Sequence, residues 1–429
     1  MLRTTPSPHL SGFRAVPRTG VIYVMTEAAR RGYRSSDPAW ANLGQGAPET
    51  GDLPNAPERI AAIQLDDADH EYAPVDGTRA LREAVAQLYN ARYRYGKKSQ
   101  YTAENVAISA GGRTALTRLV STLGRAHVGH FLPDYTAYEE LLDAFGTFVP
   151  IPVLLDPVRQ YDFSSVELQR EISGRGLSAV LLSNPCNPTG KLLYGARMRE
   201  WVETARSLGC ALIFDEFYSH YIYVGDHPTV SAARYVEDVD TDPVVLVDGL
   251  TKNWRYPGWR VCWTVGPRHI IDAVASAGSF LDGGCAHPMQ KAALPLLDPG
   301  LADREAQALQ RHFRKKRQFM LEGLESLGII VDLPTQGGFY GWGDLSRLPA
   351  HLNTGMKLFR AGLEEGVITV PGEFFDINPG HRRPDRPSRF RQYTRFSFGP
   401  DLKTLERGLA ALKRTLEAPA NRSVSGDAG

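Results

Sequence analysis

Short apolar runs that end in glycine, proline or polar residues recur through the middle of the chain. Clear examples cover residues 105–108, 178–183, 209–214 and 243–247. Runs of this length predict buried strands. Because helix-forming segments alternate with them, they predict a mostly parallel sheet sandwiched by helices. Open α/β sheets bind their ligands at the carboxyl ends of the strands. The residues that follow these runs are therefore the first candidates for a site.

The run 243–247 is followed by Lys252, and Arg260 lies eight residues further on, across a Pro-Gly turn. A lysine amine that is partly desolvated and close to other cations can lose its proton near neutral pH and attack an aldehyde. The guanidinium of Arg260 has a planar set of donors that suits a phosphate. Together they predict pyridoxal phosphate as the cofactor. On the spacing alone, a solvated turn lysine and a surface arginine are the better explanation, so the prediction depends on the residues at the other strand ends.

A Gly-Gly turn follows the run 105–108 and includes Gly112, with Arg113 next to it. Free backbone N–H groups at the start of a helix form an anion site. The turn is not the GxGxxG motif, and the acidic residue that a dinucleotide fold uses for ribose is missing, so a monophosphate fits better than NAD. Tyr135 follows the next predicted strand. Its ring could stack on a flat heterocycle, or it could be an ordinary core tyrosine.

Two further strand ends carry Asn187 and Asp215. Asn187 stands between two prolines that fix its path, which favours a functional role over a plain turn. Asp215 ends an apolar run, and Tyr218 follows three residues later. A carboxylate at the mouth of a hydrophobic sheet is costly unless it meets a cation. The pyridinium nitrogen of the predicted cofactor is such a cation, and an aspartate there keeps the ring electron-accepting.

The charge balance and cysteine content limit the classes of partner and the compartment. The 429 residues include 49 basic and 48 acidic side chains, a net charge of +1, which argues against nucleic-acid and membrane partners and favours a small substrate. No apolar run is long enough to cross a bilayer, and the N-terminus lacks the apolar core of a secretory signal. The four cysteines have no metal-ligand spacing. We expect a cytoplasmic protein with reduced thiols and no metal.

The chain is expected to divide into four parts. Residues 1–50 form a loosely held arm and a helix over 21–31, with Ile22, Met25 and Ala29 on one face, and this part packs with a smaller C-terminal domain. Residues 51–300 form the large cofactor-binding domain. Residues 301–417 form a smaller α+β domain with helices over 301–327 and 357–365 and strands over 329–333 and 338–342. Residues 418–429 are expected to be disordered.

Five segments carry a resemblance to a known family. They are Asn-Pro-Cys-Asn-Pro-Thr-Gly at 184–190, Asp-Glu-Phe-Tyr at 215–218, the Lys252 segment that ends in Gly-Trp-Arg, Tyr-Thr-Arg-Phe-Ser-Phe at 393–398, and Leu-Gly-Gln-Gly-Ala-Pro-Glu at 43–49. From about residue 17 to 416 the chain resembles the fold-type I pyridoxal-phosphate enzymes, and within them the class I/II aminotransferases related to aspartate aminotransferase. The resemblance implies amino-group transfer between an L-amino acid and a 2-oxo acid.

The resemblance also implies a role for each matching residue. Lys252 would form the Schiff base (internal aldimine) with pyridoxal 5′-phosphate and then move the proton. Asp215 would pair with the pyridine nitrogen, and Asn187 and Tyr218 with the phenolic oxygen. Gly112, Arg113 and Arg260 would bind the phosphate, and Tyr135 would stack on the ring. Tyr72 would reach the phosphate of the neighbouring subunit in a homodimer. The substrate α-carboxylate would bind Gly46, Asn187 and Arg395.

Two alternatives stay open on the sequence. The chain departs from the family pattern at Arg255, Tyr256 and Cys262, where smaller or aliphatic residues are usual. Elimination, replacement or cyclisation at Cβ or Cγ of an amino acid could therefore follow from the same cofactor chemistry. A non-catalytic, ligand-sensing regulator of transcription is the other alternative. It is disfavoured because about twenty residues precede the first predicted helix, too few for a helix-turn-helix domain.

Overall fold

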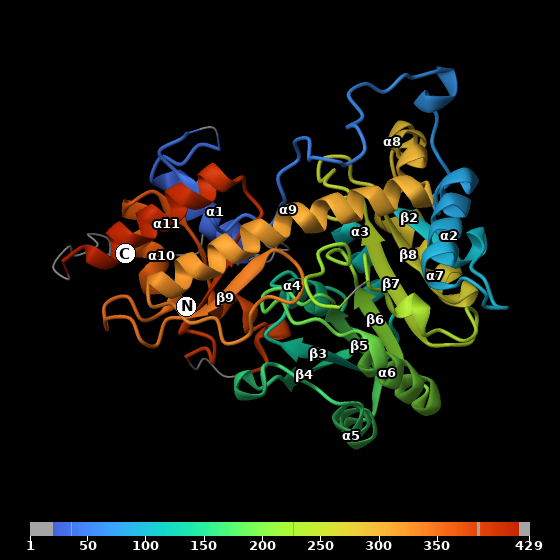
Figure 1. The fold of residues 1–429 in the computed structure, drawn as a ribbon. Coiled ribbons are helices and arrows are strands. Elements are labelled where there is room, and N and C mark those ends of the chain that lie inside the picture. The colour runs from blue at the N-terminus through green and yellow to red at the C-terminus, as the bar shows by residue number, and fades with distance from the viewer. Residues whose placement is uncertain (1–19, 36, 226, 384–386, 420–429) are drawn as a thin grey trace, which may run out of the picture.

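The structure is a computed structural model that describes residues 20–35, 37–225, 227–383 and 387–419. A seven-stranded sheet forms its centre, with the strand order β2-β8-β7-β6-β5-β3-β4 (Figure 1). The strands are β2 (Val106–Ser109), β3 (His127–Leu132), β4 (Val149–Leu154), β5 (Leu177–Ser183), β6 (Ala211–Asp215), β7 (Val244–Gly249) and β8 (Cys262–Val265).

All neighbouring strands of this sheet pair in parallel except at β8, which is antiparallel to both β2 and β7. The carboxyl ends of β2, β3, β5, β6 and β7 therefore lie at one edge. Strands such as β7 are buried along their whole length, which is why their sequences read as continuous apolar runs. The predicted mostly parallel sheet is confirmed.

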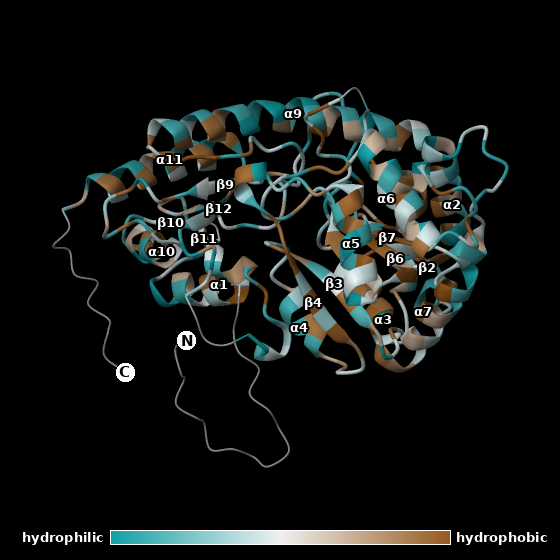
Figure 2. Ribbon diagram, turned by 90° about the horizontal axis from the view of Figure 1, so that it is seen from below, coloured by the Kyte–Doolittle hydropathy of each residue, from teal (hydrophilic) through white to brown (hydrophobic). Residues whose placement is uncertain are grey.

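Helices cover both faces of this sheet. Figure 2 shows α3 and α7 on one side and α5 and α6 on the other. The helices that follow or flank the strands are α2 (Arg79–Tyr93), α3 (Gly112–Ser121), α4 (Tyr138–Asp143), α5 (Ser165–Arg175), α6 (Gly195–Leu208), α7 (Arg268–Leu281) and α8 (His287–Ala293). No helix in the described ranges combines the length and the apolar character needed to cross a lipid bilayer.

A second group of elements lies beside the sheet. The helix α9 (Pro299–Ser326) runs from the large sheet to this group (Figure 1). The group contains an antiparallel sheet of order β11-β12-β9 and a parallel pair, β1 with β10. Its members are α1 (Gly20–Arg30), β1 (Ala41–Asn42), β9 (Tyr340–Asp344), α10 (Gly355–Glu364), β10 (Val367–Ile368), β11 (Val370–Pro371), β12 (Tyr393–Ser397) and α11 (Leu402–Glu417).

Two local expectations differ from the structure. The helix α1 exists, but it buries Val24 and Ala28, whereas Ile22 and Ala29 are exposed. The buried face of α1 therefore differs from the predicted one. Packing against neighbouring elements, and not the position of the most apolar residue, decides which face is buried. Residues 329–333 form no strand; Ile330 makes a single bridge to Asp344. The arm at 1–19 and the tail at 420–429 lie outside the described residues.

Candidate active site

A cavity of about 430 Å³ opens at the carboxyl edge of the large sheet. The predicted residues that line it come from the ends of five strands, β2, β3, β5, β6 and β7, so the parallel arrangement brings distant parts of the sequence together. Eight predicted residues line the cavity: Gly112, Arg113, Tyr135, Asn187, Asp215, Tyr218, Lys252 and Arg260. The walls also include Leu116, Ser183, Phe217, Thr251 and Pro257, which sequence reasoning did not single out.

A glycine pair and an arginine form one end of the cavity. Gly111 has a φ of +102°, and a Cβ atom there would lie 1.9 Å from the Arg260 guanidinium. A Cβ at Gly112 would lie 2.4 Å from the Phe217 ring. Only glycine fits both positions. Because α3 begins at Gly112, the first N–H groups of that helix and a guanidinium meet at a place that suits an anion.

Asp215 lies in the cavity wall and is only 4% exposed. Its carboxylate accepts hydrogen bonds from the Tyr138 hydroxyl at 2.9 Å and from the Phe217 N–H at 3.4 Å. Burial raises the pKa of Asp215 to about 6, although the Tyr138 hydrogen bond and the charge of Lys252 oppose the rise. A buried carboxylate held by neutral donors is suited to a cationic ligand atom.

The Lys252 amine lies in the same cavity and donates to the Gly46 carbonyl oxygen. Burial lowers the pKa of Lys252 to about 8, and the positive charges of Arg395, Arg260 and Arg113 lower it further in that order. A substantial fraction of this amine is therefore unprotonated near neutral pH, as a nucleophile or a general base requires.

Arg395 comes from β12 in the second group of elements and is 1% exposed. It donates to the Asn187 side-chain oxygen at 2.8 Å and to the Gly44 carbonyl at 2.9 Å. Its Nε atom is buried and has no hydrogen-bond partner within the described ranges. Buried donors are nearly always satisfied, so the spare donor capacity of this guanidinium indicates an anionic ligand such as a carboxylate.

The other predicted residues are arranged differently. The Arg113 guanidinium lies 3.4 Å from the Tyr135 hydroxyl. The Tyr218 hydroxyl is 2.8 Å from the Tyr340 hydroxyl. Tyr72 lies away from the cavity of its own chain and is 98% exposed. Sequence reasoning missed Tyr138, at the start of α4, and Tyr340, at the start of β9.

Arg255, Tyr256 and Cys262, which depart from the family pattern, do not line the cavity. Arg255 is buried, forms an ion pair with Glu305 at 2.7 Å and donates to the Gly51 carbonyl. The Arg59 guanidinium lies 3.5 Å from the centre of the Tyr256 ring. These side chains hold the segment around 51–60 against the large sheet. Cys262 packs against Gly249 and contacts the Thr251 hydroxyl.

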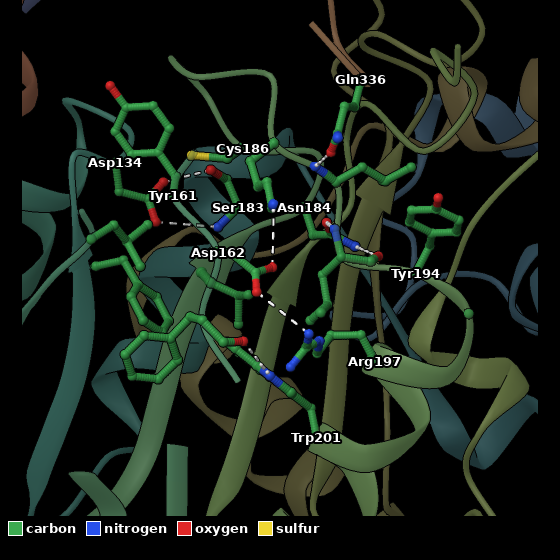
Figure 3. Close-up of a pocket in the computed structure, with 18 of the residues that line it drawn as sticks. Asp134, Tyr161, Asp162, Ser183, Asn184, Cys186, Tyr194, Arg197, Trp201 and Gln336 are labelled. Carbon is green, nitrogen blue, oxygen red and sulfur yellow. Dashed lines mark hydrogen bonds and ion pairs between the residues drawn. The ribbon is translucent and has the colours of Figure 1, made fainter. Parts of the chain in front are cut away.

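A second cavity, of about 460 Å³, is shown in Figure 3, and Ser183 lines both cavities. Its polar groups bind one another: Asp162 pairs with Lys191 at 3.3 Å and with Arg197 at 3.4 Å. The Trp201 indole N–H donates to a backbone carbonyl. None of the predicted site residues lines this cavity, whereas eight of them line the one that contains Lys252.

The donor set of the Lys252 cavity fits pyridoxal phosphate. The glycine pair with Arg260 suits the phosphate, and the buried carboxylate of Asp215 suits the pyridinium nitrogen. The amine of Lys252 suits the aldehyde, and the ring of Tyr135 supplies an aromatic wall. Each charged group of the cofactor would thus find a protein group of opposite charge or a hydrogen-bond donor in this cavity.

Comparisons with known proteins agree with this geometry. An aspartate aminotransferase from Sulfurisphaera tokodaii is 27% identical over 92% of this chain and 94% of its own length. A probable aspartate/prephenate aminotransferase from Thermus aquaticus is 30% identical over 71% of this chain and 76% of its own length. The structure of Thermus thermophilus aspartate aminotransferase with maleate has the same fold, with a TM-score of 0.76 at 24% identity, covering 94% of this chain and all of the other.

The family model described as aminotransferase class I and II matches residues 38–412. That range contains every strand described above and all the residues predicted for the site. The predictions of the fold, the cofactor and the reaction class are confirmed. The chain belongs to the class I and II aminotransferases and is a pyridoxal-phosphate-dependent transaminase.

Proposed function

We propose that the Lys252 cavity is the active site, and that it transfers an amino group between an L-amino acid and a 2-oxo acid. The observation that carries the proposal is the presence of a lysine with a lowered pKa and an aspartate with a raised pKa in one cavity. Titratable groups whose pKa values move toward neutrality in a cleft are typical of catalytic sites. Amines and carboxylates of this kind carry out proton transfers at neutral pH.

Bound pyridoxal phosphate supplies an aldehyde and an electron-accepting ring, which together weaken the Cα–H bond of an amino acid. In the proposed site Lys252, as a free amine, would take the Cα proton of the amino acid and return it during the transfer. Asp215 would lie against the ring nitrogen and keep it protonated. Asn187 and Tyr218 would hold the phenolic oxygen. Gly112, Arg113 and Arg260 would hold the phosphate, and Tyr135 would stack on the ring.

The substrate α-carboxylate is proposed to bind Arg395, with Gly46 and Asn187 beside it. The spare, buried Nε donor of Arg395 supports this role. The Gly46 carbonyl accepts a hydrogen bond from the Lys252 amine, which supports a carboxylate position close to the proposed proton-transferring group. The alternative of elimination or cyclisation at Cβ or Cγ is not favoured, since the similar proteins are named as aspartate, prephenate and diaminopimelate aminotransferases.

A homodimer with shared sites is proposed from the position of Tyr72. This tyrosine is 98% exposed, on a segment fixed to α8 by Lys291, which pairs with Asp66 and Asp69. A large, rigid and exposed aromatic residue on an anchored segment is typical of an interface. If Tyr72 acts in the neighbouring subunit, mixing Lys252→Ala and Tyr72→Ala chains yields hybrid dimers that contain one intact site. Recovery of activity on mixing supports the shared site, and no recovery contradicts it.

The division of the chain is proposed to fall near residues 50, 300 and 417, with α9 joining the two domains. The pairing of β1 with β10 supports placing the N-terminal segment with the small domain. The four cysteines are free and buried, which supports a reducing compartment such as the cytoplasm. Limited proteolysis and fractionation of cells test these two statements.

The decisive experiment uses the purified holoenzyme and a panel of amino acids. Its near-ultraviolet and visible spectrum is followed with each amino acid, and the products are identified by mass. Amino-group transfer from a labelled amino acid to pyruvate or 2-oxoglutarate is the expected result. Release of ammonia or of a side-chain leaving group without transfer would contradict the proposal.

A further inference from the structure

Tyr340 lies where two parts of the active site meet, although it does not line the Lys252 cavity. It is the first residue of β9 and is 1% exposed. Its hydroxyl is 2.8 Å from the hydroxyl of Tyr218, and its ring centre is 4.1 Å from the guanidinium carbon of Arg395. One side chain therefore contacts both a residue proposed to hold the cofactor and the residue proposed to bind the substrate.

The backbone holds Tyr340 from both domains. The N–H groups of Gln336 and Gly338 donate to the carbonyls of Gly190 and Tyr221, both at 2.9 Å. On the other side, β9 pairs with β12, and Tyr340 lies opposite Ser397, two residues from Arg395. The backbone on both sides of Tyr340 is therefore held by hydrogen bonds to the rest of the chain, and the ring itself is buried.

The Tyr218 and Tyr340 hydroxyls differ in the hydrogen-bond partners that each can reach. Burial raises the pKa of both Tyr218 and Tyr340, so both carry their protons at neutral pH. One of these protons forms the hydrogen bond between the two oxygens. Only Tyr218 lines the cavity and has a ligand-facing direction for the other proton. The arrangement in which Tyr340 donates to Tyr218, and Tyr218 donates into the cavity, satisfies both groups.

We propose that Tyr340 is a positioning residue that links the two halves of the site: its hydroxyl directs the Tyr218 proton toward the cofactor oxygen, and its ring holds the plane of the Arg395 guanidinium. This inference rests on the proposed function of the cavity. Phe375 lies near the same guanidinium, at 5.2 Å, so the arginine is flanked by two aromatic rings. Aromatic faces stabilise a guanidinium and fix its orientation.

The hydroxyl is tested with Tyr340→Phe, and Tyr223→Phe is the matched control. Tyr223 is also buried, its hydroxyl donates to the Gly338 carbonyl at 2.8 Å, and it does not line the cavity. In Tyr340→Phe, we expect the pH midpoint of the holoenzyme's colour change to rise by about 0.5 pH unit. We expect kcat to fall about 3- to 10-fold and KM to change by less than about twofold. The control is expected to retain the wild-type midpoint and kcat.

The ring is tested with Tyr340→Met, which keeps an apolar side chain but removes the aromatic face. We expect KM for the best amino acid of the panel to rise about fivefold beyond that of Tyr340→Phe. If Tyr340→Met does not fold, as judged by its melting temperature, Phe375→Met provides the same measurement. A Tyr340→Phe enzyme with an unchanged colour midpoint and kcat overturns the hydroxyl link. If KM is the same in Tyr340→Met as in Tyr340→Phe, the proposal that the Tyr340 ring holds the Arg395 guanidinium is overturned. Failure of the proposed function is distinguishable, because the wild-type enzyme would then not transaminate.

Discussion

Asp215→Asn separates the charge of the buried carboxylate from its shape. In the structure this carboxylate meets two neutral donors, Tyr138 and the Phe217 N–H. An asparagine at this position can still accept the Tyr138 hydrogen bond through its side-chain oxygen, whereas it carries no charge at any pH. The variant therefore removes the cost of burying a negative charge in the apoenzyme. It also removes the proposed partner of the pyridinium nitrogen in the holoenzyme.

The magnitude follows from the pKa of Asp215, which burial raises from 3.8 to about 6. A rise of that size corresponds to about 3 kcal/mol. Because the folded-state pKa lies above the unfolded value, the stabilisation is complete below pH 3.8 and is lost as the pH rises through 6. At neutral pH the apoenzyme therefore carries a penalty of about 3 kcal/mol. The bound cofactor cation offsets it.

The assay is urea unfolding of the two apoenzymes at about pH 5 and about pH 8. The gain in unfolding free energy from Asp215→Asn is expected to be about 1.5 kcal/mol larger at the higher pH. In the holoenzyme the same variant is expected to lower kcat by about 100-fold, the rate equivalent of 3 kcal/mol. Asp242→Asn is the control. Asp242 pairs with Arg206 at 2.6 Å, and its pKa is lowered, so that variant is expected to lose stability instead.

Parallel pH dependence in the wild-type and Asp215→Asn apoenzymes would falsify the reasoning about buried charge. A fall in kcat below about tenfold would show that the carboxylate does not stabilise the reacting ring. The two results are independent, since the first concerns the empty cavity and the second the loaded one. Either can fail alone.

Three further predictions follow from the same contacts. Lys252→Ala is expected to lower kcat about 100- to 10,000-fold and to abolish covalent retention of the cofactor, checked by mass spectrometry after borohydride reduction; a retained adduct would place the attachment elsewhere. Arg395→Lys loses the planar donor set, so kcat/KM for amino acids is expected to fall about 10- to 100-fold, mainly through KM, in steady-state kinetics; an unchanged KM would exclude a carboxylate-binding role. Glu49→Gln leaves the buried Lys316 amine without its charged partner at 2.5 Å and is expected to cost about 2 kcal/mol in urea unfolding. In spite of burial, His312 and Lys316 lower the pKa of Glu49 to about 2. The stabilisation from the Glu49 charge is therefore present above pH 4.5 and is lost as the pH falls toward 2. If the wild-type unfolding free energy does not fall with pH more steeply than that of Glu49→Gln in this range, Glu49 does not stabilise the fold through its charge.

The arrangement of the strand ends could be predicted because it depends on local pattern. Apolar runs give the strands, and parallel pairing places their carboxyl ends at one edge. Lys252 and Asp215 therefore lie in one cavity, as the sequence analysis expected. The apolar face of α1 was predicted wrongly because Ile22 is more apolar than Val24 or Ala28 but faces away from the neighbouring elements. Hydrophobicity alone does not say which side of a short helix meets the core.

Residues that act through a partner far away in the sequence could not be predicted. Arg255 pairs with Glu305 and binds the segment near Gly51, so its departure from the family pattern concerns the fixing of that segment and not the walls of the cavity. Tyr138 and Tyr340 contact Asp215 and Tyr218 across 77 and 122 residues of sequence. A sequence pattern carries no information on such pairs, because they depend on how whole elements pack.

The sequence by itself determined the chemistry that each strand end carries, since residue type and the spacing of apolar runs suffice to place an amine, a carboxylate and a phosphate cradle at one edge of a sheet. Only the tertiary structure decided how these groups are charged and supported. The pKa of a buried group depends on its distance from water and from other charges, which are properties of packing. The same holds for the contacts of Tyr340, a residue of the small antiparallel sheet that reaches Tyr218 beyond the end of β6.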